Sequence, residues 1–372
     1  MLPDDEIIIR DYLEGDEGQI NDLHNKEYNT NRNIEQWKWE FQNGPCGKSI
    51  FVVAEYKGKI IGTQALLPII LSQQGNDILS GKSEETLVDR DFRGKGILKK
   101  LLSRCFDIAD KRGIKVIWGF TPQDEIFKRS GFHISGKLKY AILTINCFQT
   151  YQLNKNKVPN IFNRNVISPI IKNLAEFFFV MFSFLQFKSK IKKVKSSNNC
   201  SIEIISNNDS RLDRFWQYYR QKKQFITIAR TSRYLRWRIF ENPNLSSRII
   251  AAMINSEIYG YVIVSVNDCD NSGIIVDFCM LDDLSDEIAL ILMNNAIEYL
   301  NSQGAAFIVA CYANTNSETK RYVHTLKKIG FTNVPGGSAI VLKQISNDNQ
   351  LGDYLKDVSS WYITYLFSEG TN

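Results

Sequence analysis

A short loop rich in glycine and basic residues has the clearest chemical potential in this sequence. It reads VDRDFRGKGIL from Val88 to Leu98, between an apolar stretch typical of a strand and a stretch with helical periodicity. The first backbone N–H groups of a helix lack internal partners and lie at the positive end of its dipole. Gly94 and Gly96 allow a ligand to approach these groups closely, and Arg93 and Lys95 add positive charge. The pattern indicates a phosphate site, although a glycine pair alone also fits an ordinary turn.

The elements around this loop occur twice in the chain. The segments WEFQNGP and IFVVAEYKGKIIG, ending at Gly62, have counterparts in WRIFENP and RIIAAMINSEIYG, ending at Gly260. The interval from Trp39 to Gly62 equals that from Trp237 to Gly260. Each copy continues to a helical stretch, an apolar strand and a K-x-x-G-F corner. Ordered agreement over several elements predicts two copies of one α/β unit.

Local patterns give both copies the same layout of strands and helices. Each copy opens with a strand and an amphipathic helix and then forms a hairpin, at 51–55 with 59–67 and at 249–253 with 258–264. Helices at about 97–112 and 286–303 lead into strands at 115–120 and 306–311. This order predicts an α/β fold with a mixed sheet covered by helices. The expected domains are 1–147 and 201–346, with a connector at 148–200 and a C-terminal segment at 347–372.

Composition narrows the class of protein. A chain of 372 residues is long enough for two cores, and 46 basic against 40 acidic residues give a net charge of only +6. So mild a charge predicts no nucleic-acid partner. The seven cysteines are widely spaced without a C-x-x-C pair, and the N-terminus lacks the pattern of a signal peptide. These features favour a reducing cytoplasm and predict no metal site.

The connector differs in texture from both copies. An apolar stretch at 170–187 is followed by the basic run KSKIKKVK, and polar residues leave the stretch too short to cross a bilayer. The segment fits a helix buried between the two copies. It also fits peripheral membrane contact through 170–195, which would place the protein at the inner face of the membrane.

The loop and its surroundings resemble a known family. Val88, Arg93 and Gly96 match the R/Q-x-x-G-x-G/A signature of motif A in the GNAT superfamily of N-acetyltransferases, which follows a strand that often ends in Val. The resemblance covers about residues 5–135, including the G-K-I-I-G hairpin and the corner at 130–132. It implies two tandem acyl-CoA N-acyltransferase-like domains, a tandem architecture known from bacterial proteins, with acetyl-CoA as the co-substrate.

The family resemblance also assigns roles to the loop. The backbone at Leu87 and Val88 would pair with the pantetheine arm, and the acetyl thioester would lie near Glu85, Leu87 and Gly119. The pyrophosphate would be held by the residues from Phe92 onward, namely Phe92, Arg93, Gly94, Lys95, Gly96, Ile97 and Leu98. The family usually has Gly or Ala where this chain has Leu98, and a Tyr where it has Phe127.

Two glutamates before the loop are the candidate proton acceptors. An amine attacks a thioester only when neutral, so a carboxylate must take its proton directly or through water. Glu84 and Glu85 alternate along the expected strand, so at most one should face the cleft. Both also fit a pair of solvated charges, and His133 is a weaker candidate.

The second copy departs from the motif. We expect its equivalent loop at 276–286, VDFCMLDDLSD, which has no glycine and several acids that would repel phosphates. The second domain is therefore expected to be degenerate.

The whole pattern predicts transfer of an acetyl group from acetyl-CoA to a primary amine, with an amino sugar of surface polysaccharide synthesis as the first acceptor to test. Two alternatives stay open. One is aminoacyl transfer, which motif A argues against; the other is a non-catalytic module that binds coenzyme A or a partner.

Overall fold

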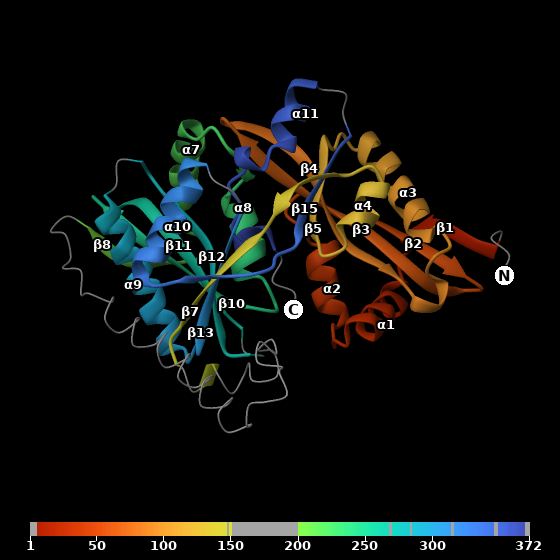
Figure 1. Cartoon of the computed structure of the whole chain (residues 1–372), viewed down its shortest axis with the longest axis horizontal. Coiled ribbons are helices and arrows are strands. Elements are labelled where there is room, and N and C mark those ends of the chain that lie inside the picture. Colours follow the sequence, from red (N-terminus) through yellow and green to blue (C-terminus); the bar gives the residue numbers. More distant parts are fainter. Residues whose placement is uncertain are drawn as a thin grey trace, which may run out of the picture.

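The chain folds into two halves that lie side by side (Figure 1). The computed structural model describes residues 6–146, 149–150, 200–267, 270–282, 285–313, 316–345 and 349–368. Most of the predicted connector, including all of 170–195, lies outside these residues. Within them, no helix is long and apolar enough to cross a membrane.

A mixed sheet forms the centre of the first half. The strand order is β1-β2-β3-β4-β5-β15-β6, and the short strand β9 pairs with β3. The strands are β1 (Ile7–Asp11), β2 (Ile50–Tyr56), β3 (Lys59–Gln73), β4 (Asn76–Val88), β5 (Val116–Thr121), β6 (His133–Lys137), β9 (Ile226–Ile228) and β15 (Ala339–Gln344). The helices are α1 (Glu17–Tyr28), α2 (Ile34–Phe41), α3 (Ile97–Lys111) and α4 (Asp124–Arg129).

A second sheet repeats this plan in the order β8-β10-β11-β12-β13-β7-β14. Its strands are β7 (Lys139–Thr144), β8 (Ser201–Ile205), β10 (Ser246–Ile254), β11 (Glu257–Asn267), β12 (Ser272–Met280), β13 (Phe307–Tyr312) and β14 (Thr332–Val334). The helices are α7 (Arg211–Lys222), α8 (Ser232–Leu235), the π-helical turn η3 (Arg236–Phe240), α9 (Asp286–Ser302) and α10 (Ser317–Ile329). The repeat predicted from the sequence is confirmed, and the predicted hairpins, helices and strands agree with these bounds to within a few residues, although β3 extends well past residue 67.

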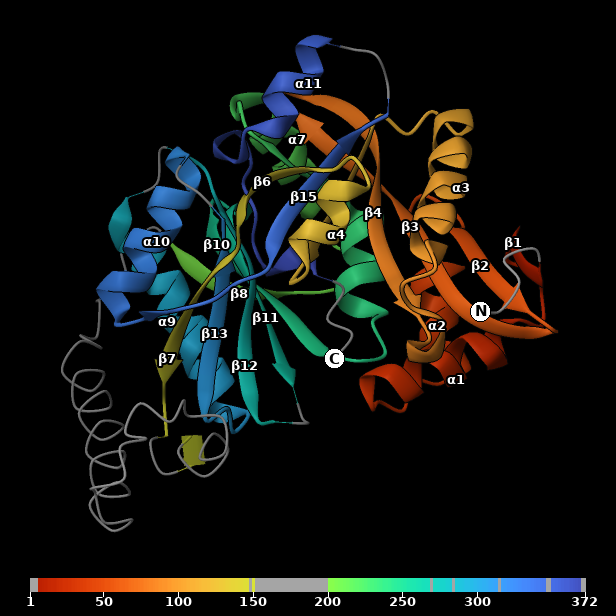
Figure 2. The same ribbon diagram turned by 45° about the vertical axis from the view of Figure 1, so that its right-hand side comes forward.

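The two sheets exchange one strand. β15 follows the second unit in sequence but pairs with β5 and β6 in the first sheet. β7 follows the first unit but pairs with β13 and β14 in the second. Figure 2 shows β7 running from the first half into the second, with β15 beside β6. The ranges predicted for the domains therefore describe the repeat in sequence, whereas hydrogen bonding assigns these two strands to the opposite halves.

Helices cover both faces of the first sheet. The apolar positions of α3 fall at helical spacing, so Leu101, Cys105 and Ala109 are buried against alternate residues of β2 such as Val52. The other face of β2, with Phe51, packs toward α1, α2 and the second half in one large core. The side of the sheet that carries α1 and α2 thus faces the middle of the molecule.

The halves meet through the two tryptophans of the repeat. The rings of Trp39 and Trp237 stack with centroids 5.0 Å apart and planes at 17°. Each indole N–H donates to the backbone carbonyl of the other residue, at 3.1 and 3.0 Å. Both side chains are buried. Equivalent residues therefore contact each other reciprocally, as expected across a pseudo-twofold axis.

The chain ends in a segment that crosses the core. After α11 (Asn349–Lys356), the C-terminal strap, residues 357–368, includes the turns η4 (Val358–Ser360) and η5 (Tyr365–Phe367). The turn η5 contacts both β12 and β13, whose pairing ends at Ile275 and Ala310. The hydroxyl of Tyr362 donates to the carbonyl of Phe278 on β12. The strap thus fills the space between the diverging strands of the second half.

Candidate active site

A cleft opens in the first half where β4 and β5 separate. The two strands pair in parallel only from Ser80 to Lys82 and from Val116 to Trp118. Beyond these residues they diverge and leave a cleft of about 610 Å³. Of the residues assigned to coenzyme binding, the cleft is lined by Leu87, Val88, Phe92, Arg93, Gly94, Gly96, Ile97 and Leu98. Gly119 lies on the opposite wall.

The start of α3 is open toward this cleft. Gly96 is the N-cap residue with φ 73°, and no side chain caps the helix. Gly94 also has a positive φ, and a Cβ at either glycine would meet no atom within 4 Å. An uncapped helix start with open space above it can accept an anion. Lys95, which we predicted to contact phosphate, is outside the cleft lining, and its Nζ lies 5.1 Å from the centre of the Phe92 ring.

The corresponding helix start of the second half is capped. The sequence predicts the equivalent loop at 276–286, but Val276 and Asp277 lie inside β12 and are fully buried. The loop follows Met280, and α9 begins at Asp286, so the turn is shorter than that of the first half. The Ser285 side chain accepts from the N–H of Ile288 at the start of α9. A side-chain cap therefore occupies the position that is open in α3.

A β-bulge shapes the floor of the cleft. Glu85 has a φ of 51°, and the pairing of β3 with β4 shifts by one residue beside it. The amide of Gln64 fills the gap, donating to the carbonyl of Glu84 at 3.1 Å and accepting from the Thr86 hydroxyl at 2.8 Å. Bulges interrupt the alternation of side chains along a strand. Both glutamates consequently line the cleft, whereas strict alternation predicted at most one.

Glu85 is held in a buried ion pair. Its two oxygens accept from the Arg32 guanidinium at 2.7 and 2.8 Å, and both lie 3.1 Å from Nδ1 of His24. Burial alone would raise the pKa of Glu85, but the hydrogen bonds and charges of His24 and Arg32 outweigh it and hold the pKa below its ordinary value. A carboxylate committed to such partners is a weak proton acceptor.

The same ion pair occurs in the second half. Arg230 follows Arg32 by 198 positions, the interval that separates Trp237 from Trp39. It donates to both oxygens of Asp277 at 2.6 and 2.9 Å. Asp277 lies three residues before the end of β12, as Glu85 does in β4. A half with a capped helix start retains the pair, so the pair serves the fold of both halves.

Glu84 is the more accessible carboxylate. Its side chain is 29% exposed and pairs with the ammonium of Lys82, which is buried. The Lys82 nitrogen also lies 5.8 Å from the centre of the Trp118 ring. This arrangement leaves Glu84 in contact with cleft solvent beside a fixed positive charge. Of the two predicted proton acceptors, its geometry is the better suited to that role.

A phenol that sequence reasoning missed lies on the α1 side of the cleft. Tyr28 is the last residue of α1, and its ring centre is 4.9 Å from that of His24. Desolvation of its hydroxyl and the charges of Glu85 and Glu84 raise the pKa of Tyr28 to about 12, so it stays protonated near neutral pH. Phe127 also lines the cleft and carries no hydroxyl. The cleft lining thus contains a phenol at Tyr28 but none at position 127.

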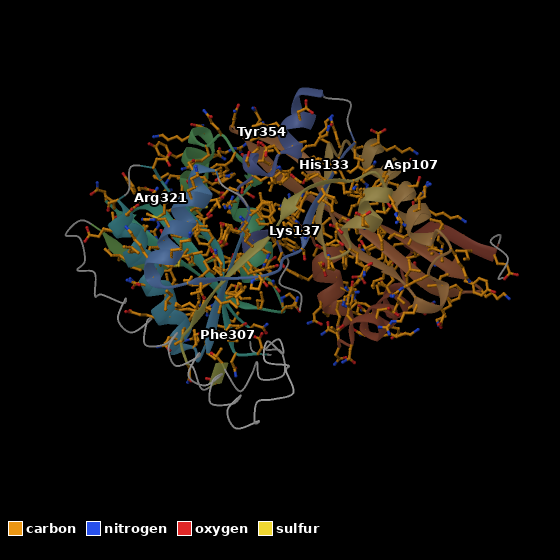
Figure 3. The ribbon with its side chains drawn as sticks, viewed as in Figure 1. Asp107, His133, Lys137, Phe307, Arg321 and Tyr354 are labelled. Atoms are coloured by element: carbon orange, nitrogen blue, oxygen red, sulfur yellow. The ribbon has the colours of Figure 1, made fainter. Side chains whose placement is uncertain are left out.

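Two other residues considered from the sequence lie apart from the cleft. His133 is exposed at the start of β6 and is outside the cleft lining (Figure 3). Cys105 is buried in α3, and burial raises the pKa of its thiol, so it is unsuited to act as a nucleophile.

Comparisons with known proteins agree with this geometry. Residues 8–135 match the acetyltransferase (GNAT) domain family. No curated protein is detectably similar to the chain in sequence. A probable N-acyltransferase from Enterococcus faecalis V583 has a similar structure at 9% identity and a TM-score of 0.60, covering 91% of this chain and 72% of that one.

Two further solved structures share the two-domain plan. A tandem GNAT protein from the clavulanic acid biosynthesis pathway aligns over 92% of this chain and 100% of its own, with 12% identity and a TM-score of 0.58. The N-myristoyltransferase of Saccharomyces cerevisiae, solved with bound myristoyl-CoA, aligns over 92% and 80%, with 10% identity and a TM-score of 0.62. The fold is therefore that of two tandem acyl-CoA N-acyltransferase domains, of which the second is degenerate.

Proposed function

We propose that this chain is an N-acetyltransferase that moves an acetyl group from acetyl-CoA to a primary amine, with an amino sugar as the acceptor class. The observation that carries the proposal is the uncapped start of α3, which opens into the cleft between β4 and β5. The free backbone amides of that turn suit a pyrophosphate, and the diverging edge of β4 suits an extended pantetheine arm. In the second half, the corresponding helix start is capped by the Ser285 side chain.

The residues of the cleft divide the chemistry between them. The acceptor arrives as an ammonium, and Glu84 takes its proton directly or through water, so that the neutral amine attacks the thioester carbon. A backbone N–H on the splayed part of β4 would stabilise the developing oxyanion near Gly119. The attacking nitrogen gives up a second proton to solvent, the C–S bond breaks, and the coenzyme thiolate takes a proton from Tyr28 or from solvent. Glu85 and Arg32 hold the α1–α2 segment against the bulge.

Two observations bear on the acceptor and the setting. A fungal glucosamine N-acetyltransferase region shares the fold at 12% identity and a TM-score of 0.56, which supports trying amino sugars first. Among the described cysteines, Cys46, Cys105, Cys200, Cys279 and Cys311 are free thiols. Free thiols fit a cytoplasmic location, where acetyl-CoA is made. Attachment to the inner membrane face through 170–195 stays a proposal.

Thiol release measured with a panel of amines tests the proposal. Purified chain and acetyl-CoA should release coenzyme A with glucosamine or a nucleotide-linked amino sugar, above the rate without amine. Replacing Glu84 with Gln should lower kcat by about 10²-fold or more, the range for loss of a general base. The matched control is Asp107→Asn, an exposed acid on α3 (Figure 3), which should leave the rate unchanged.

The alternative function is a module that binds coenzyme A without turnover. Leu98 and Phe127 favour it, because Leu98 is bulkier than the usual Gly or Ala and Phe127 lacks the hydroxyl of the usual Tyr in the cleft that both line. Binding of acetyl-CoA without thiol release across the panel would support that alternative. Absence of binding would remove the acetyltransferase function and leave only a module that binds a partner.

A further inference from the structure

A buried carboxylate on α1 forms ion pairs with the two arginines of the coenzyme loop. Glu27 lies in the last turn of α1, lines the cleft, and its side chain is only 3% exposed. One of its oxygens, Oε2, accepts from the guanidinium of Arg93 at 2.5 Å and from Nε of Arg90 at 3.2 Å. Both arginines come from the loop before α3 and are more than half exposed. The acid therefore neutralises positive charge that a pyrophosphate would use.

Arg93 also occupies the strand edge. Its Nε donates to the carbonyl of Val88 at 2.9 Å. The next residue, Asp89, donates its backbone N–H to Ile61 of β3, so alternation points the polar groups of Val88 away from β3 and toward the splayed side. An extended ligand that pairs with Val88 must displace Arg93 from this carbonyl. In the free protein, two nitrogens of the Arg93 guanidinium are thus bound by Val88 and Glu27, which both line the cleft.

The second oxygen of Glu27 has no partner within the described part of the chain. Oε1 is buried and accepts no hydrogen bond there. Buried carboxylate oxygens are nearly always satisfied, and an orphan in a cleft wall marks a position where a ligand donor would be favoured. If the arginines also moved away, both oxygens of Glu27 would lack donors in a pocket that already holds Glu84. Such a site selects a cation.

We propose that Glu27 exchanges its ion-pair partners when coenzyme binds. The phosphates draw Arg93 and Arg90 away from Glu27, and the freed carboxylate then binds the positively charged amino group of the acceptor. This inference rests on the proposed function and refines it. The acceptor binds after the coenzyme and binds as a cation, so a weakly basic aromatic amine is a poor substrate. Because coupling between two binding sites is reciprocal, bound acceptor also tightens the hold on coenzyme.

Calorimetric titration of the full chain with coenzyme A tests the first half of the proposal. Glu27→Gln removes the charge but keeps the shape, and should tighten coenzyme A binding about two- to fivefold, the scale of one partly exposed ion pair. Asp22→Asn removes an exposed charge from the same helix and should leave the affinity unchanged. In a chain that also carries Arg90→Gln and Arg93→Gln, Glu27→Gln should give no gain, because no arginine remains to be released.

The acceptor tests the second half. Glu27→Gln should raise the KM for glucosamine while changing kcat little, and coenzyme A should no longer improve glucosamine binding. Glu27→Asp retains the charge on a shorter side chain and should show smaller changes in the same directions, which keeps the test valid if the Gln variant folds poorly. Wild-type coenzyme affinity together with wild-type KM in Glu27→Gln would contradict the proposed exchange of partners. Failure of the wild-type chain to bind coenzyme A would instead overturn the proposed function.

Discussion

The ion pair of Glu85 and Arg32 is the residue-scale feature whose role is easiest to separate from catalysis. Arg32 is 7% exposed and Glu85 is 4% exposed, so removing one charge leaves the other buried without compensation. We predict that Glu85→Gln lowers the free energy of unfolding by about 3 kcal/mol at pH 7, as for other broken buried pairs. The exposed Glu35→Gln should change it by less than about 0.5 kcal/mol.

The pH dependence of that loss has a definite sign. The folded-state pKa of Glu85 lies below its ordinary value of 4.5, so the pair stabilises the fold above that value and loses its effect as the pH falls through the folded-state pKa. Urea unfolding should therefore show the wild-type chain and Glu85→Gln converging as the pH drops from 7 toward 3. A variant with wild-type stability at both pH values but no activity would show that Glu85 acts in catalysis.

The residues of the loop and those of α1 differ in how far the sequence could predict them. Gly94 and Gly96 act through their own backbone conformations, so their types and spacing marked the turn directly. Glu85 and Arg32 are 53 positions apart, and no local pattern pairs them. Only the repeat contained a signal, because Arg32 and Arg230 occupy equivalent positions. Tyr28 and Glu27 lie at the end of α1 and belong to no motif. Their position in the cleft follows only from the packing of α1 against β4.

At the scale of elements, the C-terminal strap makes buried contacts with β12 of the second half. The hydroxyl of Thr364 donates to Asp277 at 2.8 Å, and Thr227 donates to the carbonyl of Tyr362 at 2.9 Å. The strap therefore supplies one donor to a buried acid of β12 and accepts one hydrogen bond from β9. The sequence set residues 347–372 apart as a C-terminal segment but gave no sign of this position, because nothing in its pattern names a distant partner.

Removing one contact of the C-terminal strap should lower the free energy of unfolding. Thr364 is 1% exposed, and Thr364→Val deprives buried Asp277 of a donor, so we expect a loss of about 1–3 kcal/mol in the free energy of unfolding. Thr332→Val, at an exposed position of β14, should have little effect. Urea denaturation of the two variants checks the difference. Equal stability of Thr364→Val and wild type would show that the strap does not support the second half in this way.

At the scale of the whole molecule, strand exchange joins the two copies into one folding unit. A fragment of residues 1–147 would lack β15, leaving the facing edges of β5 and β6 unpaired, and would carry β7 without its sheet. We predict that this fragment alone shows no cooperative thermal transition, whereas the full chain unfolds in one. Circular dichroism on both checks this. A fragment that melts cooperatively and binds acetyl-CoA would contradict the prediction.

The exchange also shows the limit of the repeat argument. Matching intervals in the two copies predicted the shared order of strands and helices, and the sheets follow that order strand for strand. The apolar sequences of β7 and β15 fit either sheet equally well, however, because both strands enter the same position of the same plan. Periodicity states that a segment is a strand, and long-range packing decides which copy it joins.

The proposed function depends most on the open start of α3 as the anion site of the cleft. Calorimetric titration of acetyl-CoA into the wild-type chain and into Gly96→Asp tests it most directly, because aspartate adds charge and bulk at the N-cap residue where space is open. We predict saturable binding by the wild-type chain and loss of that binding in a folded Gly96→Asp variant. Equal affinity of the two chains, or no binding by the wild type, would contradict it.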